Sequence, residues 1–188
     1  MNPSRLWMLT GAQGAGKTTF CRALATLARQ QGWKTAGLLS PPVIEDGQKT
    51  GILTEDLLTG ETHPLAISVP HASFDLPFGR WYFNQDTLNW VNRVLENCLP
   101  CDLLIIDELG PLELIHQTGW QAAQEVLRSK DYCLGLVVVR TQLRRVFCEQ
   151  FTVHYNLEID RSQSADAWMH TWWPALAVHL SETATHPK

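Results

Sequence analysis

The feature that most constrains this chain lies near its N-terminus, where residues 11–18 read Gly-Ala-Gln-Gly-Ala-Gly-Lys-Thr. This stretch matches the phosphate-binding loop pattern G-x-x-x-x-G-K-[ST] in full. Glycines let the backbone curl so that successive N–H groups point inward at a polyphosphate. Lys17 can then reach the outer phosphates, and the Thr18 hydroxyl can bind Mg²⁺. The pattern predicts these nucleotide-binding residues: Gly11, Ala12, Gln13, Gly14, Ala15, Gly16, Lys17, Thr18 and Thr19.

The sequence around this loop has the order that the mechanism needs. Residues 5–9 form a short apolar run typical of a buried strand that enters the loop. After the loop, Phe20, Leu24 and Ala28 fall on one helical face, and Gly32 marks the end of that helix. The helix N-terminus therefore faces the anion with its unpaired N–H groups. Strand, loop and helix together predict a site for a nucleoside triphosphate.

Composition limits the class of protein. The 188 residues suffice for one well-filled α/β domain, which we expect over residues 1–181, with a frayed tail at 182–188. A net charge of −4 gives no reason to expect nucleic-acid binding. No apolar run approaches the roughly 20 residues that span a bilayer, and no signal-peptide layout precedes the loop. We therefore expect a cytoplasmic protein with no membrane contact.

The segment after the first helix departs from a simple α/β alternation. Residues 34–40 predict a strand, and turn signals at 46–47 and 59–60 separate alternating apolar segments. This spacing predicts a small antiparallel meander inserted into the α/β order. Residues 70–83 show no clear period and contain two prolines and a glycine, so we expect a loop there.

The α/β alternation then resumes. Helical periodicity is found around residues 88–95 and 112–127, whereas 103–106 and 134–139 are apolar runs typical of strands covered on both faces. A short helix is expected from about residue 141, and a strand near 155–159. A tryptophan-rich helix follows, in which Pro174 should introduce a kink or a division and Ser162 or Ser164 should be the cap. The predicted fold class is an α/β P-loop NTPase with a mostly parallel central sheet flanked by helices.

A second motif lies at the end of the predicted strand 103–106, where Asp107 and Glu108 follow directly. The carboxyl ends of parallel strands meet at the edge where the phosphate loop also lies. Asp107 is thus placed to hold Mg²⁺ together with Thr18. Glu108 comes one residue later, outside the strand, where a carboxylate can orient an attacking water and take its proton. Residues 107–110 also match the D-x-x-G of GTP-binding switches, but no N-K-x-D or T-K-x-D that would hold guanine is present.

Three arginines and one further acid are weaker candidates. Arg140 ends the strand at 134–139 and should face the phosphates, either as a catalytic group that stabilises the transferring phosphoryl or as a surface residue in a salt bridge. Arg144 and Arg145 are either solvated or part of a basic lid, which would favour a kinase. Glu113 lies in the first turn of a helix, where a structural role suffices. We predict that Lys17, Glu108 and Arg140 carry the chemistry.

The patterns of cysteines and tryptophans favour structural roles for most of these residues. The odd number of cysteines, five, argues for reduced thiols rather than a disulfide framework. Cys98 and Cys101 form a C-x-x-C between a helix and a strand, the reverse of the order in thioredoxin-like sites, so a redox or metal role is the minor hypothesis. The eight tryptophans fall mostly on apolar helical stripes, which indicates core packing; stacking of one of them on a base stays open.

At this point the sequence resembles a known family. The phosphate loop, the stretch Ile-Asp-Glu-Leu-Gly-Pro-Leu-Glu-Leu at 106–114, and Gly119-Trp120 are similar to those of the THEP1-type nucleoside-triphosphatases. The similarity extends over roughly residues 5–160, and residues 78–82 loosely resemble the family's Gly-Lys-Tyr stretch. The resemblance implies a RecA-like fold and slow Mg²⁺-dependent hydrolysis of nucleoside triphosphates with loose base discrimination. It also implies Asp107 as the Mg²⁺ acid and Glu108 as the water-activating acid.

Two alternatives to a nucleoside-triphosphatase stay open from sequence alone. One is a P-loop kinase acting on a nucleotide or another small alcohol. The other is an accessory protein whose nucleotide-driven shape change serves a partner. Glu108 directly after the Mg²⁺ acid favours hydrolysis, because it offers a base for water, and no acceptor motif is evident.

Overall fold

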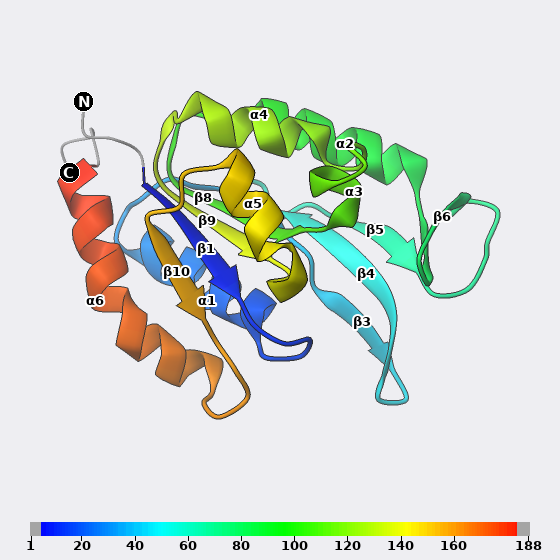
Figure 1. Ribbon diagram of the computed structural model, residues 1–188, viewed down its shortest axis with the longest axis horizontal. Coiled ribbons are helices and arrows are strands. Elements are labelled where there is room, and N and C mark those ends of the chain that lie inside the picture. Colours follow the sequence, from blue (N-terminus) through cyan, green and yellow to red (C-terminus); the bar gives the residue numbers. More distant parts are fainter. Residues whose placement is uncertain (1–4, 184–188) are drawn as a thin grey trace.

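The computed structural model describes residues 5–183 and consists of one continuous mixed sheet with helices on both faces (Figure 1). The strand order is β10-β1-β9-β8-β2-β4-β5-β7-β6, with β3 paired to β4. The strands are β1 (Arg5–Thr10), β2 (Thr35–Leu39), β3 (Pro42–Glu45), β4 (Gln48–Asp56), β5 (Thr62–Ile67), β6 (Leu76–Phe78), β7 (Trp81–Phe83), β8 (Cys101–Leu109), β9 (Tyr132–Val139) and β10 (Tyr155–Glu158). The helices are α1 (Lys17–Gln30), α2 (Gln85–Glu96), α3 (Pro111–Leu114), α4 (Gln121–Ser129), the 3₁₀ turn η1 (Thr141–Leu143), α5 (Arg144–Gln150) and α6 (Ala165–Thr183).

Strands β10, β1, β9, β8 and β2 are mutually parallel and form the half of the sheet that carries the phosphate loop. Their side chains alternate between two apolar clusters. Leu104 and Ile106 of β8 face α2, α4 and α5, whereas Leu103 and Ile105 face α1 and α6. Because both faces are covered, the strand can be continuously apolar. The α/β fold class and the parallel core of the sheet that the sequence predicts are confirmed.

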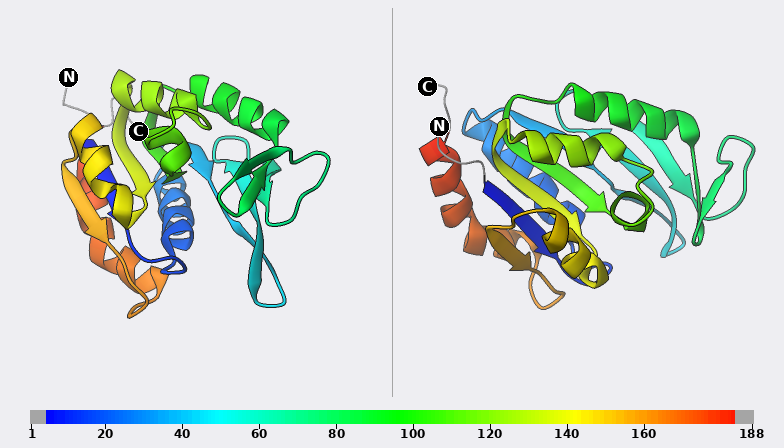
Figure 2. Two further views of the ribbon diagram at one scale, coloured as in Figure 1. Left: turned by 45° about the vertical axis from the view of Figure 1, so that its right-hand side comes forward. Right: turned by 45° about the horizontal axis from the view of Figure 1, so that its top comes forward.

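The antiparallel part of the sheet is larger than the sequence indicates. The predicted meander is present, but β4 pairs with β2, so β4, β5, β7 and β6 continue the central sheet instead of forming a separate insertion. We call this half the antiparallel extension. Its β3–β4 hairpin projects past the carboxyl ends of the parallel strands, beside the N-terminus of α1 (Figure 2).

The expectation of a loop over residues 70–83 is wrong for its second half, which forms the β6–β7 hairpin. Each strand has only three residues, too few for a periodic pattern to show. Pro77 is tolerated because β6 lies at the edge of the sheet. Pairing of β7 with β5 through Ala66 and Phe83 attaches the hairpin to the extension.

Helix α6 continues through Pro174 and is not divided there. Met169 before the proline and Leu176 after it are both buried in the same apolar cluster as α1, and this packing holds the turns on both sides. Ser164 caps the helix as predicted, since its hydroxyl accepts from the Ala167 N–H at 3.2 Å. The first two residues of the predicted tail, 182 and 183, belong to α6, and the rest of it lies outside the described residues. Within residues 5–183, no helix combines the length and apolarity that a membrane crossing needs.

Candidate active site

The phosphate loop connects β1 to α1 and has the backbone that its glycines permit. Gly14 and Gly16 have φ angles of 76° and 90°, a region that residues with a Cβ rarely adopt. A Cβ at Gly11 would collide with the carbonyl oxygen of Ile159, which follows β10. The ammonium of Lys17 donates to the carbonyl oxygens of Gly11 and Ala12 at 2.8 and 2.9 Å. The loop therefore has the glycine-dependent backbone of a phosphate-binding loop, and the Lys17 ammonium lies across it.

Asp107 and Thr18 come together as predicted. Asp107 lies near the carboxyl end of β8 and is 2% exposed; its carboxylate accepts the Ser40 N–H at 3.1 Å. Burial raises the pKa of Asp107 to about 6, and hydrogen bonds from Ser40 and from the Thr18 side chain act in the opposite direction. A buried carboxylate beside a hydroxyl is an oxygen pair that suits a hard divalent cation, whose charge would offset the burial of the acid.

Glu108 lies inside β8 rather than after it, which corrects the expectation that it follows the strand. The pairing of β8 with β9 shifts register here, because Asp107 pairs with Val138 and Leu109 with the next residue, Val139. Glu108 is the additional residue of this irregularity, which re-aims its side chain. The carboxylate is 32% exposed and accepts from Arg140 Nε at 2.6 Å. It is thus open to water beside the buried Asp107.

The three arginine candidates separate in space. Arg140 directly follows β9 and lines the same cavity as the phosphate loop, where it pairs with Glu108. Arg144 and Arg145 belong to α5 and do not line that cavity. Arg145 is 90% exposed and forms an i,i+4 pair with Glu149. The basic lid that would favour a kinase is therefore not supported by their positions.

Glu113 has the structural role that the sequence suggests. Its buried carboxylate accepts from the Gly110 N–H at 2.8 Å and from the Trp120 N–H at 3.2 Å. Burial raises its pKa, and the two backbone hydrogen bonds oppose that rise. Glu113 therefore fastens the loop that follows Glu108 to the turn that begins α4.

The cavity at this site has a volume of about 750 Å³ and extends from the phosphate loop to the antiparallel extension. Its far wall is formed by Ile52, Leu65 and Phe83, and by the β6–β7 hairpin with Arg80 and Trp81. Lys49 at the start of β4 also faces it. Lys49 belongs to no motif and is therefore not among the residues that the sequence predicts as functional. The one sequence signal for the β6–β7 hairpin is the loose resemblance of residues 78–82 to the family's Gly-Lys-Tyr stretch.

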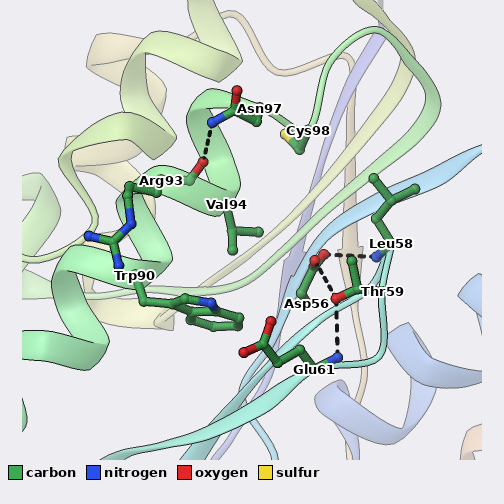
Figure 3. Close-up of a pocket in the computed structure, with 9 residues that line it drawn as sticks. All are labelled: Asp56, Leu58, Thr59, Glu61, Trp90, Arg93, Val94, Asn97 and Cys98. Atoms are coloured by element: carbon green, nitrogen blue, oxygen red, sulfur yellow. Dashed lines mark hydrogen bonds between the residues drawn. The ribbon is translucent and has the colours of Figure 1, made fainter.

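A second cavity, of about 340 Å³, lies between the β4–β5 turn and α2 (Figure 3). Its polar groups are mostly engaged in closing the turn. Asp56 accepts from the Leu58 N–H at 2.8 Å and from the Thr59 hydroxyl at 2.7 Å, and Thr59 in turn accepts from the Glu61 N–H. None of the residues that the sequence predicts as functional lines this cavity.

The C-x-x-C cysteines are buried and reduced. Cys98 and Cys101 are free thiols, and burial is the main cause that raises the pKa of Cys98 to about 11 and that of Cys101 further. Such thiols are poor nucleophiles and metal ligands. Among the described residues, no cluster of three or more His, Cys, Asp or Glu side chains could hold a metal. This supports the packing interpretation of the pair.

A phosphate-binding loop at the end of β1, with an acid near the end of β8, a parallel strand separated from β1 by β9, defines a P-loop NTPase. Comparison with known proteins narrows this class. The sequence model of a family described as NTPase matches residues 7–163. The chain is 36% identical over 132 residues to the nucleoside-triphosphatase THEP1 of Methanosarcina acetivorans, covering 69% of this chain and 73% of the relative. It is 37% identical over 128 residues to that of Metallosphaera sedula, covering 68% and 67%.

Solved structures agree at the level of the fold. The solution structure of a human cancer-related nucleoside triphosphatase matches with a TM-score of 0.71 at 19% identity, covering 97% of this chain and all of that one. The crystal structure of THEP1 from Aquifex aeolicus matches with a TM-score of 0.62 at 15% identity, covering 91% and 98%. The chain belongs to the THEP1 nucleoside-triphosphatase family of P-loop NTPases and is a nucleoside-triphosphatase.

Proposed function

We propose that this nucleoside-triphosphatase hydrolyses several nucleoside triphosphates to diphosphate and phosphate in a Mg²⁺-dependent reaction, with loose discrimination among bases. The observation that supports it best is the adjacency of two different carboxylates. Asp107 is buried and hydrogen-bonded with Thr18, whereas Glu108, the next residue, is open to water in the same cavity. One position suits a metal ligand and the other a base for water.

Thr18 and Asp107 are the residues that would hold Mg²⁺, since a hydroxyl and a carboxylate are ligands of the kind this ion takes beside substrate phosphates. When bound, Mg²⁺ neutralises charge that develops on the phosphate oxygens during transfer. The N–H groups of the loop and the ammonium of Lys17 bind the same phosphates from the α1 side. These contacts orient the terminal phosphate toward β8.

Glu108 then acts on water. A water oxygen forms a new bond to the terminal phosphorus while the bond between that phosphorus and the bridging oxygen breaks, and the diphosphate leaves. Glu108 accepts the proton that the water loses, a role that its exposed carboxylate can fill. Arg140, now paired with Glu108 at 2.6 Å, both orients this acid and offers N–H donors to the transferring phosphoryl group.

Loose base discrimination follows from what the chain lacks. The sequence contains neither N-K-x-D nor T-K-x-D, the motifs that hold guanine. Affinity would therefore come mainly from the phosphates, which are common to all nucleotides.

A phosphate-release assay tests this function. Purified protein is supplied with Mg²⁺ and with ATP, GTP, CTP or UTP, without any acceptor, and compared with Glu108→Gln. We expect release from several of the four, and a loss of about 10²-fold or more in the variant, the scale of a general-base contribution. Phosphate transfer that appears only when an alcohol acceptor is added would show a kinase instead. Parent-like turnover by Glu108→Gln would remove Glu108 as the base even if hydrolysis is real.

A further inference from the structure

Lys49 is a cation in the wall of the active-site cavity to which neither the motifs nor the family resemblance gives a role. It lies at the start of β4, in the antiparallel extension, and lines the cavity opposite the phosphate loop. Its charged neighbours are Glu108, Asp107, Arg140 and Arg80, and among these the attraction of Glu108 acts on it most strongly. Lys49 and the acid that we propose activates water therefore line the same cavity and attract each other.

The ammonium of Lys49 is half-buried, and no hydrogen bond or salt bridge engages it within the described part of the chain. Its recorded contact is the indole of Trp81, whose centroid lies 5.4 Å from Nζ. Burial lowers the pKa of Lys49, while Glu108 and Asp107 raise it. A partly desolvated ammonium without a hydrogen-bond acceptor is costly on its own, and an anion in the cavity would remove that cost.

The β6–β7 hairpin fixes Lys49 in this position. The guanidinium of Arg80 stacks over the Trp81 ring at 4.4 Å and donates to the backbone carbonyl oxygen of Lys49 at 3.2 Å. Glu108 accepts from Arg140 at 2.6 Å, and within the described residues no salt bridge joins it to Lys49. The arrangement thus places an ammonium that has no hydrogen-bond acceptor among the described residues in the wall of the cavity that Glu108 also lines.

The direction in which the phosphates must lie identifies the group that Lys49 meets. In a phosphate loop of this kind, the N–H groups and Lys17 would hold the phosphate chain from the N-terminus of α1, and the terminal phosphate would lie toward Asp107 and Glu108 on β8. Lys49 lines the same cavity from β4, in the antiparallel extension. A diphosphate would not extend as far as a triphosphate toward β4.

We propose that Lys49 binds the terminal phosphate of the nucleoside triphosphate and thereby makes the site prefer triphosphates over diphosphates. This inference rests on the proposed function, since it takes the position of the terminal phosphate from Lys17, Asp107 and Glu108. It gives the antiparallel extension a part in substrate binding that the parallel strands alone do not supply.

The test is equilibrium binding of two probes in the presence of Mg²⁺: a fluorescent non-hydrolysable GTP analogue and the matching GDP analogue. The variants are Lys49→Met and the conservative Lys49→Arg. Lys34→Met serves as the control, because it removes the same charge from an exposed residue at the opposite, amino-terminal edge of β2. Thermal unfolding of each variant shows whether the fold is kept.

We expect Lys49→Met to bind the triphosphate analogue roughly tenfold to hundredfold more weakly, the range for losing a charged hydrogen bond, and the diphosphate analogue within about twofold of the parent. Lys49→Arg should recover most of the affinity, and Lys34→Met should bind both probes like the parent. Parent-like triphosphate binding by Lys49→Met, or an equal loss for both probes in a folded variant, would overturn the inference. Because binding requires no turnover, this result is separate from the outcome of the Glu108→Gln assay.

Discussion

The two halves of the sheet contribute to one cavity by different routes. The parallel half supplies the phosphate loop, Asp107, Glu108 and Arg140, all at the carboxyl ends of its strands. The antiparallel extension supplies no recognised motif, yet it forms the opposite wall with apolar side chains and with Lys49 and Arg80. In the function that we propose, the parallel strands carry the chemistry and the antiparallel extension contributes to substrate binding.

We expect the largest effect on phosphate release from Asp107→Asn. A small effect would contradict the assignment of the chemistry to the parallel half of the sheet. We expect phosphate release to fall by about 10²- to 10³-fold at fixed Mg²⁺, since an amide is a weaker ligand for a hard cation and several kcal/mol of charge stabilisation is at stake. A titration of activity with Mg²⁺ measures the effect, and a variant with parent-like activity and Mg²⁺ dependence would remove Asp107 as the metal ligand.

The same substitution should stabilise the metal-free protein. Burial raises the pKa of Asp107 from 3.8 to about 6, so the folded state binds this proton more tightly than the unfolded chain does. The stability that the folded state gains from binding this proton is therefore present below pH 4 and is lost as the pH rises through 6. Asparagine removes the buried charge, and urea unfolding at pH 7 without Mg²⁺ should show a gain of up to about 3 kcal/mol. A loss of stability would contradict this sign.

Arg140→Ala is expected to have the next largest effect on the reaction. It tests whether Arg140 acts on the phosphoryl group or only pairs with Glu108. Loss of a donor to the transferring phosphoryl group should lower kcat by about 10²-fold. The free energy of unfolding should change by less than about 1 kcal/mol, because its pair with Glu108 is partly exposed. Steady-state kinetics measures the change in kcat, and urea unfolding measures the change in stability. An unchanged kcat would leave Arg140 with a surface salt bridge as its only role.

Trp81→Leu should have the smallest effect, a modest loss of triphosphate affinity. It tests the part in substrate binding that we propose for the antiparallel extension. The substitution removes the aromatic face beside the Lys49 ammonium and beneath Arg80 but keeps both cations. At about 0.5–1 kcal/mol for a partly exposed cation–π contact, triphosphate affinity should fall roughly two- to fivefold. The binding assay described for Lys49 measures it. A loss larger than that of Lys49→Met would mean that Trp81 itself contacts the nucleotide.

Sequence reasoning predicted the parallel strands and the antiparallel meander, but not the β6–β7 hairpin, the pairing of β4 with β2 or the cavity wall that the extension forms. The phosphate loop and the acids after a buried strand are local patterns whose spacing is dictated by their chemistry. The position of Glu108 within β8 was missed because a register irregularity depends on pairing with β9, a distant segment. Lys49 enters the cavity wall only through pairing of β4 with β2 and support from the β6–β7 hairpin. Such contacts leave no periodicity in the chain.

A structure of the protein with Mg²⁺ and a non-hydrolysable triphosphate tests the central claim most directly, because it shows whether both halves of the sheet hold one substrate. We expect Mg²⁺ on Thr18 and Asp107, a water beside Glu108, and the terminal phosphate within hydrogen-bonding distance of both Lys17 and Lys49. The claim would be contradicted by a nucleotide whose base packs against the cavity wall between β4 and β7 while Lys49 lies far from every phosphate.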